Sequence, residues 1–254
     1  MIKAVFFDID GTLLSHSMNG VSGKTMQALN ALREQGIKVI ICTGRHALEM
    51  EELGLFSLPA DGYILLNGQI VMNEKHEIIA STPFTGETKE TLVRMFREKK
   101  IPIVIMEEND IYISFVNDYV REAQAAVHTS VAPEGEYTGN DIYMCMGYFN
   151  EYPDTVIPGV QRASWYDGAD DLIPENVSKA DGMKEWLDHY GIDVSDTMAF
   201  GDGDNDAEMI SYAGTGIAMG NASERAKAFA DYITADIDEE GVYKALVRFG
   251  LLSE

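Results

Sequence analysis

Apolar residues alternate along the chain between short strand-like runs and longer helix-like segments. Residues 3–7 form an apolar run that ends at Asp8, residues 22–36 have helical spacing after the N-cap Ser22, and a second apolar run covers residues 37–42. Near-continuous apolar strands are typical of a parallel sheet that is covered on both faces. A strand, a helix and a strand in this order therefore predict a right-handed parallel crossover.

The pattern changes in the middle of the chain. After a helix at residues 45–53 and a strand at residues 63–66, Asn67-Gly68 and Asn73-Glu74 are typical of turns in short antiparallel ribbons. Short β-rich runs and two helical segments then follow without regular alternation. This part of the chain predicts helices at 87–99 and 118–128 and strands at 102–106, 111–116, 142–149 and 162–166.

The alternation of helices and strands returns in the last third of the chain. Its predicted helices cover 179–189, 204–212, 222–230 and 239–249, and its predicted strands cover 197–200 and 216–218. The fold class is therefore predicted to be α/β, with a doubly wound parallel sheet that is interrupted by an inserted α+β domain. The expected catalytic core comprises residues 1–82 and 178–254, and the expected insertion comprises residues 83–177.

Composition and charge narrow the classes of partner. The 254 residues carry a formal net charge of -23, which argues against a nucleic-acid partner because affinity for phosphate backbones comes from clustered Lys and Arg. No apolar run approaches the roughly 18 residues of a membrane span, so no membrane partner and a cytoplasmic location are expected. Cys42 and Cys145 lack metal or redox spacing and are expected to be reduced, buried thiols.

Polar clusters at the ends of the predicted strands are the candidates for chemistry, because ligands of open α/β sheets bind beyond the carboxyl ends of the strands. Asp8 and Asp10 follow the first strand, and alternate residues of an extended segment point the same way. Two adjacent carboxylates repel each other unless a divalent cation lies between them or one holds a proton. A strand that simply ends in a capped turn is the alternative.

Two further segments could supply positive charge. Thr43-Gly44-Arg45 combines a hydroxyl, a glycine that allows close backbone approach, helix N-terminal amides and a guanidinium, which together make an anion site. Lys179 begins a helix, where the first turn favours anions, so a functional role would explain its position. Each segment by itself is also compatible with an ordinary helix cap, Thr43 or Ser178.

The acidic loop at residues 201–206, GDGDND, follows a third apolar strand. It lacks the third glycine of a dinucleotide fingerprint, and as a calcium loop it lacks the required Gly and Glu, so both are rejected. Asp202 directly ends the strand and is the strongest candidate for a metal ligand, and Mg²⁺ suits a set of oxygen ligands. Whether Asp204 or Asp206 also supports the metal stays open, because helix capping explains acids at these positions equally well.

In order along the chain, DIDGT at 8–12, CTGR at 42–45, Lys179 and GDGDND at 201–206 resemble the four motifs of the haloacid dehalogenase superfamily. The inserted domain and the segment AMGNA at 218–222 resemble its Cof-type sugar-phosphatase branch, which has a large αβ cap. The resemblance covers nearly the whole chain. It implies a Rossmann-like catalytic core whose cap selects the leaving group.

The resemblance also implies a reaction and a set of site residues. Asp8 would attack phosphorus to form an aspartyl phosphate, Asp10 would be the general acid and base, and Mg²⁺ would be held by Asp8, the Asp10 carbonyl and Asp202. Thr43 and Lys179 would hold the phosphoryl oxygens as part of the catalytic set. The further residues implied in binding substrate or phosphate are Gly44, Arg45, Asn205 and Asn221.

The expected function is thus a Mg²⁺-dependent phosphatase that hydrolyses small phosphomonoesters, sugar phosphates first. A phosphomutase of the same superfamily has the same motifs and is one alternative. A non-catalytic protein that binds a phosphorylated metabolite is another, although a nucleophile beside an acid has little use in binding alone. Neither the natural substrate nor the oligomeric state follows from the sequence.

Overall fold

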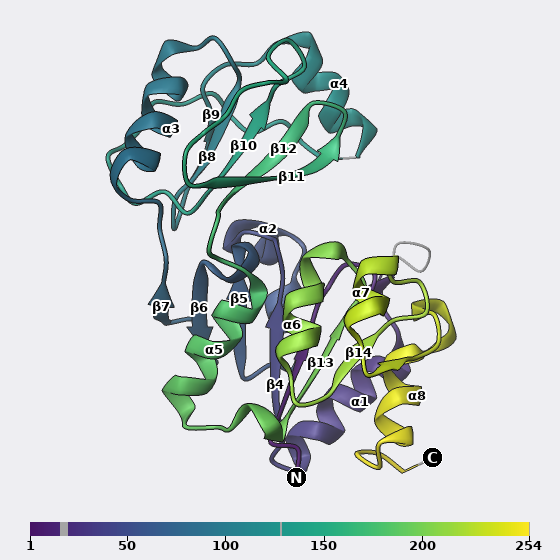
Figure 1. Ribbon diagram of the computed structural model, residues 1–254. Helices are drawn as coiled ribbons and strands as arrows, with labels where there is room; N and C mark the ends of the chain where they lie inside the picture. The colour runs from purple at the N-terminus through teal and green to yellow at the C-terminus, as the bar shows by residue number, and fades with distance from the viewer. Residues whose placement is uncertain (16–19, 128, 254) are drawn as a thin grey trace. The chain divides into compact units, whose positions relative to one another are not determined.

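The computed structural model describes residues 1–15, 20–127 and 129–253, and these residues form two units (Figure 1). The first unit comprises residues 1–45, 49–81 and 177–254, and the second comprises residues 46–48 and 82–176. Helix α2 (Ala47–Glu52) begins in the second unit and ends in the first.

A large sheet forms the centre of the first unit. Within the described residues it has eight strands, parallel from one edge as far as the sixth, with two antiparallel strands at the other edge. In spatial order these strands are β15 (Tyr232–Ile233), β14 (Gly216–Ala218), β13 (Thr197–Gly201), β1 (Ala4–Phe7), β4 (Lys38–Cys42), β5 (Gly62–Leu65), β6 (Ile70–Asn73) and β7 (Ile78–Ser81).

Helices cover both faces of this sheet, which is why the central strands are largely apolar. The helices, besides α2, are α1 (Gly23–Glu34), α5 (Lys179–Tyr190), α6 (Ala207–Tyr212), α7 (Glu224–Phe229) and α8 (Gly241–Arg248). Figure 1 shows α5, α6 and α7 in front of the strands and α1 behind them. Successive residues of β1 pack in opposite directions, since Phe6 meets Trp186 of α5 edge-on and Phe7 stacks on Phe200.

The register of the central strands brings three chain segments to one edge of the sheet. Phe7 of β1 pairs with Phe200 of β13 on one side and with Ile41 of β4 on the other. The next residues along these parallel strands therefore leave the sheet together. Asp8, Asp202 and Thr43 each lie within two residues of these paired positions.

The second unit is an antiparallel sheet with two helices. Within the described residues its five strands, in spatial order, are β11 (Val160–Tyr166), β12 (Ala169–Pro174), β10 (Met144–Tyr148), β8 (Ile103–Met106) and β9 (Ile111–Ile113), and its helices are α3 (Gly86–Glu98) and α4 (Asp118–Ala126). Phe96 of α3 packs into a core with strand residues such as Ile105 and Leu172. An antiparallel sheet with helices packed on it is an α+β arrangement.

Several local predictions were wrong or incomplete. Strand β12 was missed because its acidic pair is typical of a loop, but Asp170 is 4% exposed and accepts a hydrogen bond of 2.7 Å from Arg162. The predicted helix at 204–212 begins instead with a 3₁₀ turn, η4 (Asp204–Asp206), and the strand predicted at 111–116 ends at Ile113. The two-residue strands β2 (Leu14–Ser15), β3 (Gly20–Val21) and β15 were also missed.

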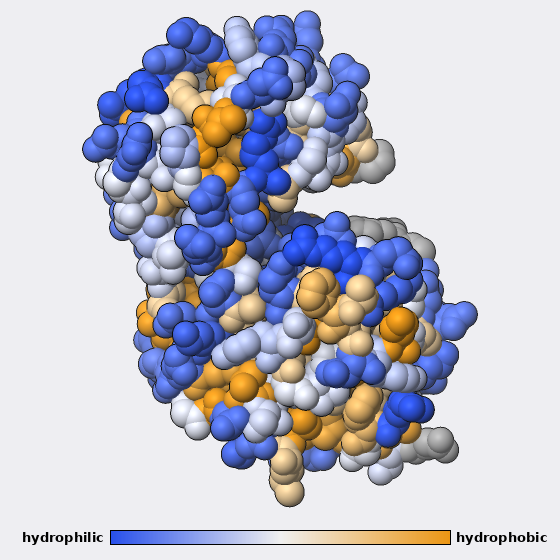
Figure 2. All heavy atoms as spheres, in the orientation of Figure 1, coloured by the Kyte–Doolittle hydropathy of each residue, from blue (hydrophilic) through white to orange (hydrophobic). Residues whose placement is uncertain are grey.

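Two simpler features of the described residues concern the cysteines and the length of the helices. Cys42 and Cys145 are free and buried, and burial raises the pKa of each thiol. No helix in the described part of the chain is long and apolar enough to cross a membrane. On the face drawn in Figure 2, apolar residues form several patches between the hydrophilic residues of both units.

Candidate active site

Asp8 and Lys179 form a buried ion pair at the carboxyl edge of the large sheet. The Lys179 ammonium donates to Asp8 Oδ1 and to Asp206 Oδ1, both at 2.6 Å, and its side chain is fully buried. Lys179 is the first residue of α5, and Ser178 caps that helix by accepting from the Asp181 amide. The helix N-terminus is unfavourable for a cation, so the two carboxylates are the reason that Lys179 is stable there.

Burial and neighbouring charges shift both members of this pair. Burial is the main cause that raises the pKa of Asp8 well above its ordinary range, and the charge of Asp206 raises it further, while Lys179 opposes the rise. Burial alone would lower the pKa of Lys179, but Asp206 and Asp8 outweigh it and the net shift is upward. Lys179 is therefore a permanent cation that holds one oxygen of Asp8.

Asp206 is a structural member of the site rather than an open ligand. Its Oδ1 binds Lys179, and its Oδ2 accepts from the backbone amides of Asp202 at 2.9 Å and Gly203 at 2.8 Å. The second of these contacts closes the turn that leads into η4. Asp206 therefore connects the acidic loop to Lys179. The sequence of the loop did not indicate this role.

Asp202 faces Asp8, and its carboxylate is held by two residues, Thr12 and Asn221. Thr12 donates to its Oδ1 at 2.9 Å, and Asn221 donates to the Gly11 carbonyl at 2.9 Å and lies 3.5 Å from Asp202 Oδ2. Gly11 has a φ of +86°, and a Cβ there would overlap the Asp202 carboxylate, so both the backbone conformation and the close approach require glycine. Asn221 thus lies beside Asp202, and its role in binding substrate stays a prediction.

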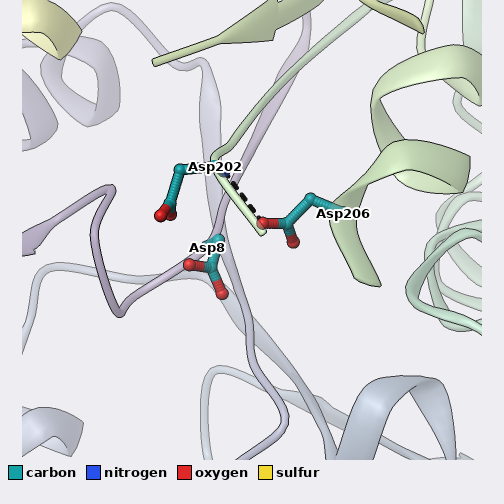
Figure 3. Close-up of side chains that lie close together, drawn as sticks. All are labelled: Asp8, Asp202 and Asp206. Atoms are coloured by element: carbon teal, nitrogen blue, oxygen red, sulfur yellow. Dashed lines mark hydrogen bonds between the residues drawn. The ribbon is translucent and has the colours of Figure 1, made fainter. Parts of the chain in front are cut away.

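Three carboxylates form a group that could hold a metal ion. Asp8, Asp202 and Asp206 each offer an oxygen within 4.8 Å of the others (Figure 3). Because Lys179 and two amides already use Asp206, the oxygens best suited to a hard cation belong to Asp8 and Asp202. Asp204 is exposed and lies outside this group.

Burial is the main cause that raises the pKa of Asp202 to about 6, with Asp206 adding to the rise and the Thr12 hydroxyl opposing it. Asp8 and Asp202 both have raised pKa values and lie close together, so they destabilise each other when both are ionised. A divalent cation would relieve this repulsion, and the donor set therefore fits one.

Asp10 and Arg45 bind each other. Arg45 Nε donates to Asp10 Oδ2 at 2.8 Å and Arg45 Nη2 donates to Asp10 Oδ1 at 2.7 Å, a bidentate pair that is partly exposed. The sequence predicted that both residues lie at the site but did not predict this pair. The side chain of Asp10 is consequently directed to the guanidinium, and it is outside the carboxylate group described above.

Thr43 and Gly44 form the turn between β4 and Arg45. Thr43 is 1% exposed, and its Oγ1 accepts from the Arg45 amide at 3.1 Å, so the hydroxyl hydrogen stays available to another acceptor. Since the chain has 42 acidic and 19 basic residues, an anionic substrate would depend on local donors such as these and on Lys179.

A buried carboxylate at the end of a parallel strand, a fixed lysine on one of its oxygens, and a second carboxylate placed for a metal define a site for phosphoryl transfer. Residues 5–246 match the family model of the haloacid dehalogenase-like hydrolases. The protein belongs to this family, and the predicted resemblance is confirmed.

Individual relatives agree with this assignment. The chain is 33% identical to YkrA of Bacillus subtilis over 98% of both chains. The name of YkrA describes it provisionally as a phosphatase. Among solved structures it is similar to the phosphatase BT1666 from Bacteroides thetaiotaomicron, with 31% identity and a TM-score of 0.89 over 99% of this chain and 96% of that one. It is also similar to the subclass IIB sugar phosphatase BT4131, with 32% identity and a TM-score of 0.81 over 98% of this chain and all of that one.

These likenesses confirm the predicted α/β fold class. They also make the protein an enzyme of the phosphatase class within its family.

Proposed function

We propose that this protein is a Mg²⁺-dependent phosphatase that hydrolyses small phosphomonoesters, sugar phosphates in particular, through a phosphoryl group carried on Asp8. The observation that carries the proposal is the state of the Asp8 carboxylate. Lys179 fixes its Oδ1, while Oδ2 accepts no hydrogen bond from any described residue and is available as a nucleophile. Asp202 stands beside it as the partner for a cation.

In the first step Asp8 Oδ2 attacks phosphorus in line with the ester oxygen. The bond from phosphorus to that oxygen breaks, and the oxygen leaves with the electron pair and takes a proton from Asp10. In the second step Asp10 removes a proton from water as the water oxygen attacks phosphorus. The bond between phosphorus and Asp8 then breaks, which releases inorganic phosphate and restores both carboxyl groups.

The remaining site residues neutralise and orient the transferred group. We assign Lys179 and the Thr43 hydroxyl to the phosphoryl oxygens, with Gly44 allowing close approach and Asn205 supporting the same region. In the free protein Arg45 is engaged with Asp10, so binding of the phosphate ester would draw the guanidinium from Asp10 to the substrate. This exchange would leave Asp10 able to carry the proton that it delivers.

Asp8, the Asp10 carbonyl and Asp202 would hold Mg²⁺. Bound there, the ion would supply positive charge to the transferring phosphoryl group. Asn221 and Thr12 would keep Asp202 oriented for this role.

The second unit would act as a cap that selects the leaving group of the substrate. Likeness to the sugar phosphatase BT4131 supports sugar phosphates as the substrate class. A relative from Escherichia coli is 28% identical over 95% of this chain and is named 5-amino-6-(5-phospho-D-ribitylamino)uracil phosphatase. The compound in that name is a polyol phosphate. Phosphorylated sugars and polyols are therefore the first compounds to test.

A phosphate-release screen tests the proposal. Sugar phosphates, polyol phosphates, nucleotides and cofactor phosphates are incubated with the protein, with and without Mg²⁺, and inorganic phosphate is measured. We expect release from one or more sugar or polyol phosphates that depends on Mg²⁺. Failure with the whole panel, or formation of an isomerised sugar phosphate in place of inorganic phosphate, would overturn the proposal.

Stabilisation by Mg²⁺ is expected to grow with pH. A carboxyl whose pKa is raised on folding contributes stability below its unfolded pKa and loses it as the pH rises through the folded value. For Asp202 this window runs from the ordinary value of 3.8 to about 6, so the metal-free protein should lose stability there. Mg²⁺ binds the ionised form and should raise Tm more at pH 7 than at pH 5.

Thermal unfolding at pH 5, 6 and 7, in EDTA and in excess MgCl₂, measures this effect. The Asp202→Asn variant is the control, because its side chain cannot ionise and its Tm should respond little to Mg²⁺ at any of these pH values. An equal Mg²⁺ response of the unmodified protein at pH 5 and pH 7 would contradict the assignment of Asp202.

A further inference from the structure

The turn between β5 and β6 has an unusual backbone at a buried position. This turn, η2 (Leu66–Gly68), joins two antiparallel strands, and Asn67 within it has φ +56° and ψ 33°. Asn67 is only 5% exposed. A left-handed backbone at a residue other than glycine has a cost, and asparagine tolerates it better than most residues.

The backbone of this turn holds the candidate phosphate loop. The Asn67 amide donates to the Thr43 carbonyl at 3.0 Å, and the Leu66 amide donates to the Arg45 carbonyl at 3.2 Å. These two carbonyls flank Gly44. The turn therefore fixes the residues on both sides of the glycine that would approach the phosphate.

The side chain of Asn67 reaches a second part of the site. Its Oδ1 accepts a hydrogen bond of 2.9 Å from Asn205 Nδ2 in the acidic loop. Its amide also lies against Gly44, since a Cβ built on that glycine would be 3.2 Å from Asn67 Nδ2 and 3.3 Å from Oδ1. One carboxamide thus lies against the phosphate loop and binds the acidic loop.

The neighbouring glycine, Gly68, packs against a third part of the site, the start of α5. Gly68 has a φ of +104°, and a Cβ on it would overlap the carbonyl oxygen of Ser178, the residue before Lys179. A Cβ on Gly182, in the first turn of α5, would come within 2.9 Å of the Gly68 Cα. The turn therefore packs against the helix end that carries the buried lysine.

We infer that Asn67 is a positioning residue of the active site, which sets Asn205 and the Thr43-Gly44-Arg45 loop at the distance that one phosphoryl group requires. The inference rests on the proposed phosphatase function for its substrate. A residue that merely formed the hairpin turn would need only a backbone that tolerates positive φ. The hydrogen bond to Asn205 and the contact with Gly44 give the side chain a further task.

Asn67→Gly separates these two roles, because glycine adopts the left-handed backbone without strain and lacks the carboxamide. Its kcat should fall by about ten- to a hundredfold, as found when groups that orient catalytic residues are removed, with a smaller change in KM and in Tm. Asn73→Gly is the matched control. Asn73 closes the next turn of the same ribbon through its contacts with Lys75 and Glu77, so Asn73→Gly should alter stability and keep kcat.

A double-variant cycle tests whether Asn67 acts through Asn205. If it does, the kcat of Asn67→Gly combined with Asn205→Ala should equal that of Asn205→Ala alone within about twofold. Losses that multiply in the double variant, or an Asn67→Gly enzyme with the kcat of the unmodified protein, would overturn the inference.

Binding of inorganic phosphate in the presence of Mg²⁺, measured by isothermal titration calorimetry, is independent of turnover. Asn67→Gly should weaken it at least several-fold, and equal affinity would count against the inference. If the unmodified protein binds phosphate but releases none from any ester, the proposed function fails while the role of Asn67 is still decided by the titration.

Discussion

Asp8→Asn is expected to reduce phosphate release by at least about a thousandfold, because the variant lacks the oxygen that would form the bond to phosphorus. The fold should be preserved. Since burial raises the pKa of Asp8, ionisation of this carboxyl costs stability in the metal-free protein, and a neutral amide should give an equal or higher Tm. Steady-state phosphate release and thermal unfolding in EDTA measure the two effects.

Asp204→Asn is the matched control for this variant, because it removes the same charge from an exposed residue of the neighbouring loop. It should keep most of the activity. Activity of Asp8→Asn within tenfold of the unmodified protein would show that the reaction does not pass through a phosphoryl group on Asp8. Trapping of ³²P-labelled protein after an acid quench, with a label that alkali or hydroxylamine releases as from an acyl phosphate, and its absence in Asp8→Asn, would identify the carrier directly.

Lys179→Met is expected to remove both activity and a large part of the stability. Methionine occupies a similar volume but leaves Asp8 and Asp206 buried without their cation. Loss of one partner from a buried ion pair costs about 3–5 kcal/mol. Because burial already raises the pKa of Asp8, that carboxyl becomes neutral first as the pH falls, and the loss should be smaller at pH 5 than at pH 8.

Urea unfolding in EDTA at both pH values gives the free energies. Lys184→Met is the matched control, since Lys184 is an exposed residue of the same helix, and it should unfold like the unmodified protein. Adding Asp206→Asn to Lys179→Met removes one of the orphaned charges and should recover part of the stability without recovering activity. If Lys179→Met alone unfolds with an unchanged free energy, the ion pair does not stabilise the fold.

Much of the fold was predictable because its signals are local. The apolar run before Asp8 and the helix after Ser22 follow from hydrophobic spacing and capping, which depend on neighbours in sequence. Strand β12 was not predictable in this way. Its acidic residue Asp170 is buried only because Arg162 from the adjacent strand provides a partner, and that pairing exists only after the strands associate.

The candidate site shows the same division. Asp8 and Asp202 could be identified because each directly follows an apolar strand, and parallel strands end at a common edge. Lys179 was indicated by its unfavourable position at a helix start. No comparable signal indicated the side-chain contacts of Asn67, since the Asn67-Gly68 pair is equally typical of any tight turn.

By itself, the sequence determined which residues end the strands, and hence that carboxylates and a Thr-Gly-Arg segment meet at one edge of an α/β sheet. Only the tertiary structure decided how they pair: Asp206 with Lys179, Asp10 with Arg45, and Asn67 with Asn205. The physical reason is that strand ends are set by local pattern and sheet topology. Hydrogen-bond partners depend instead on which loops, distant in sequence, come within about 3 Å of each other.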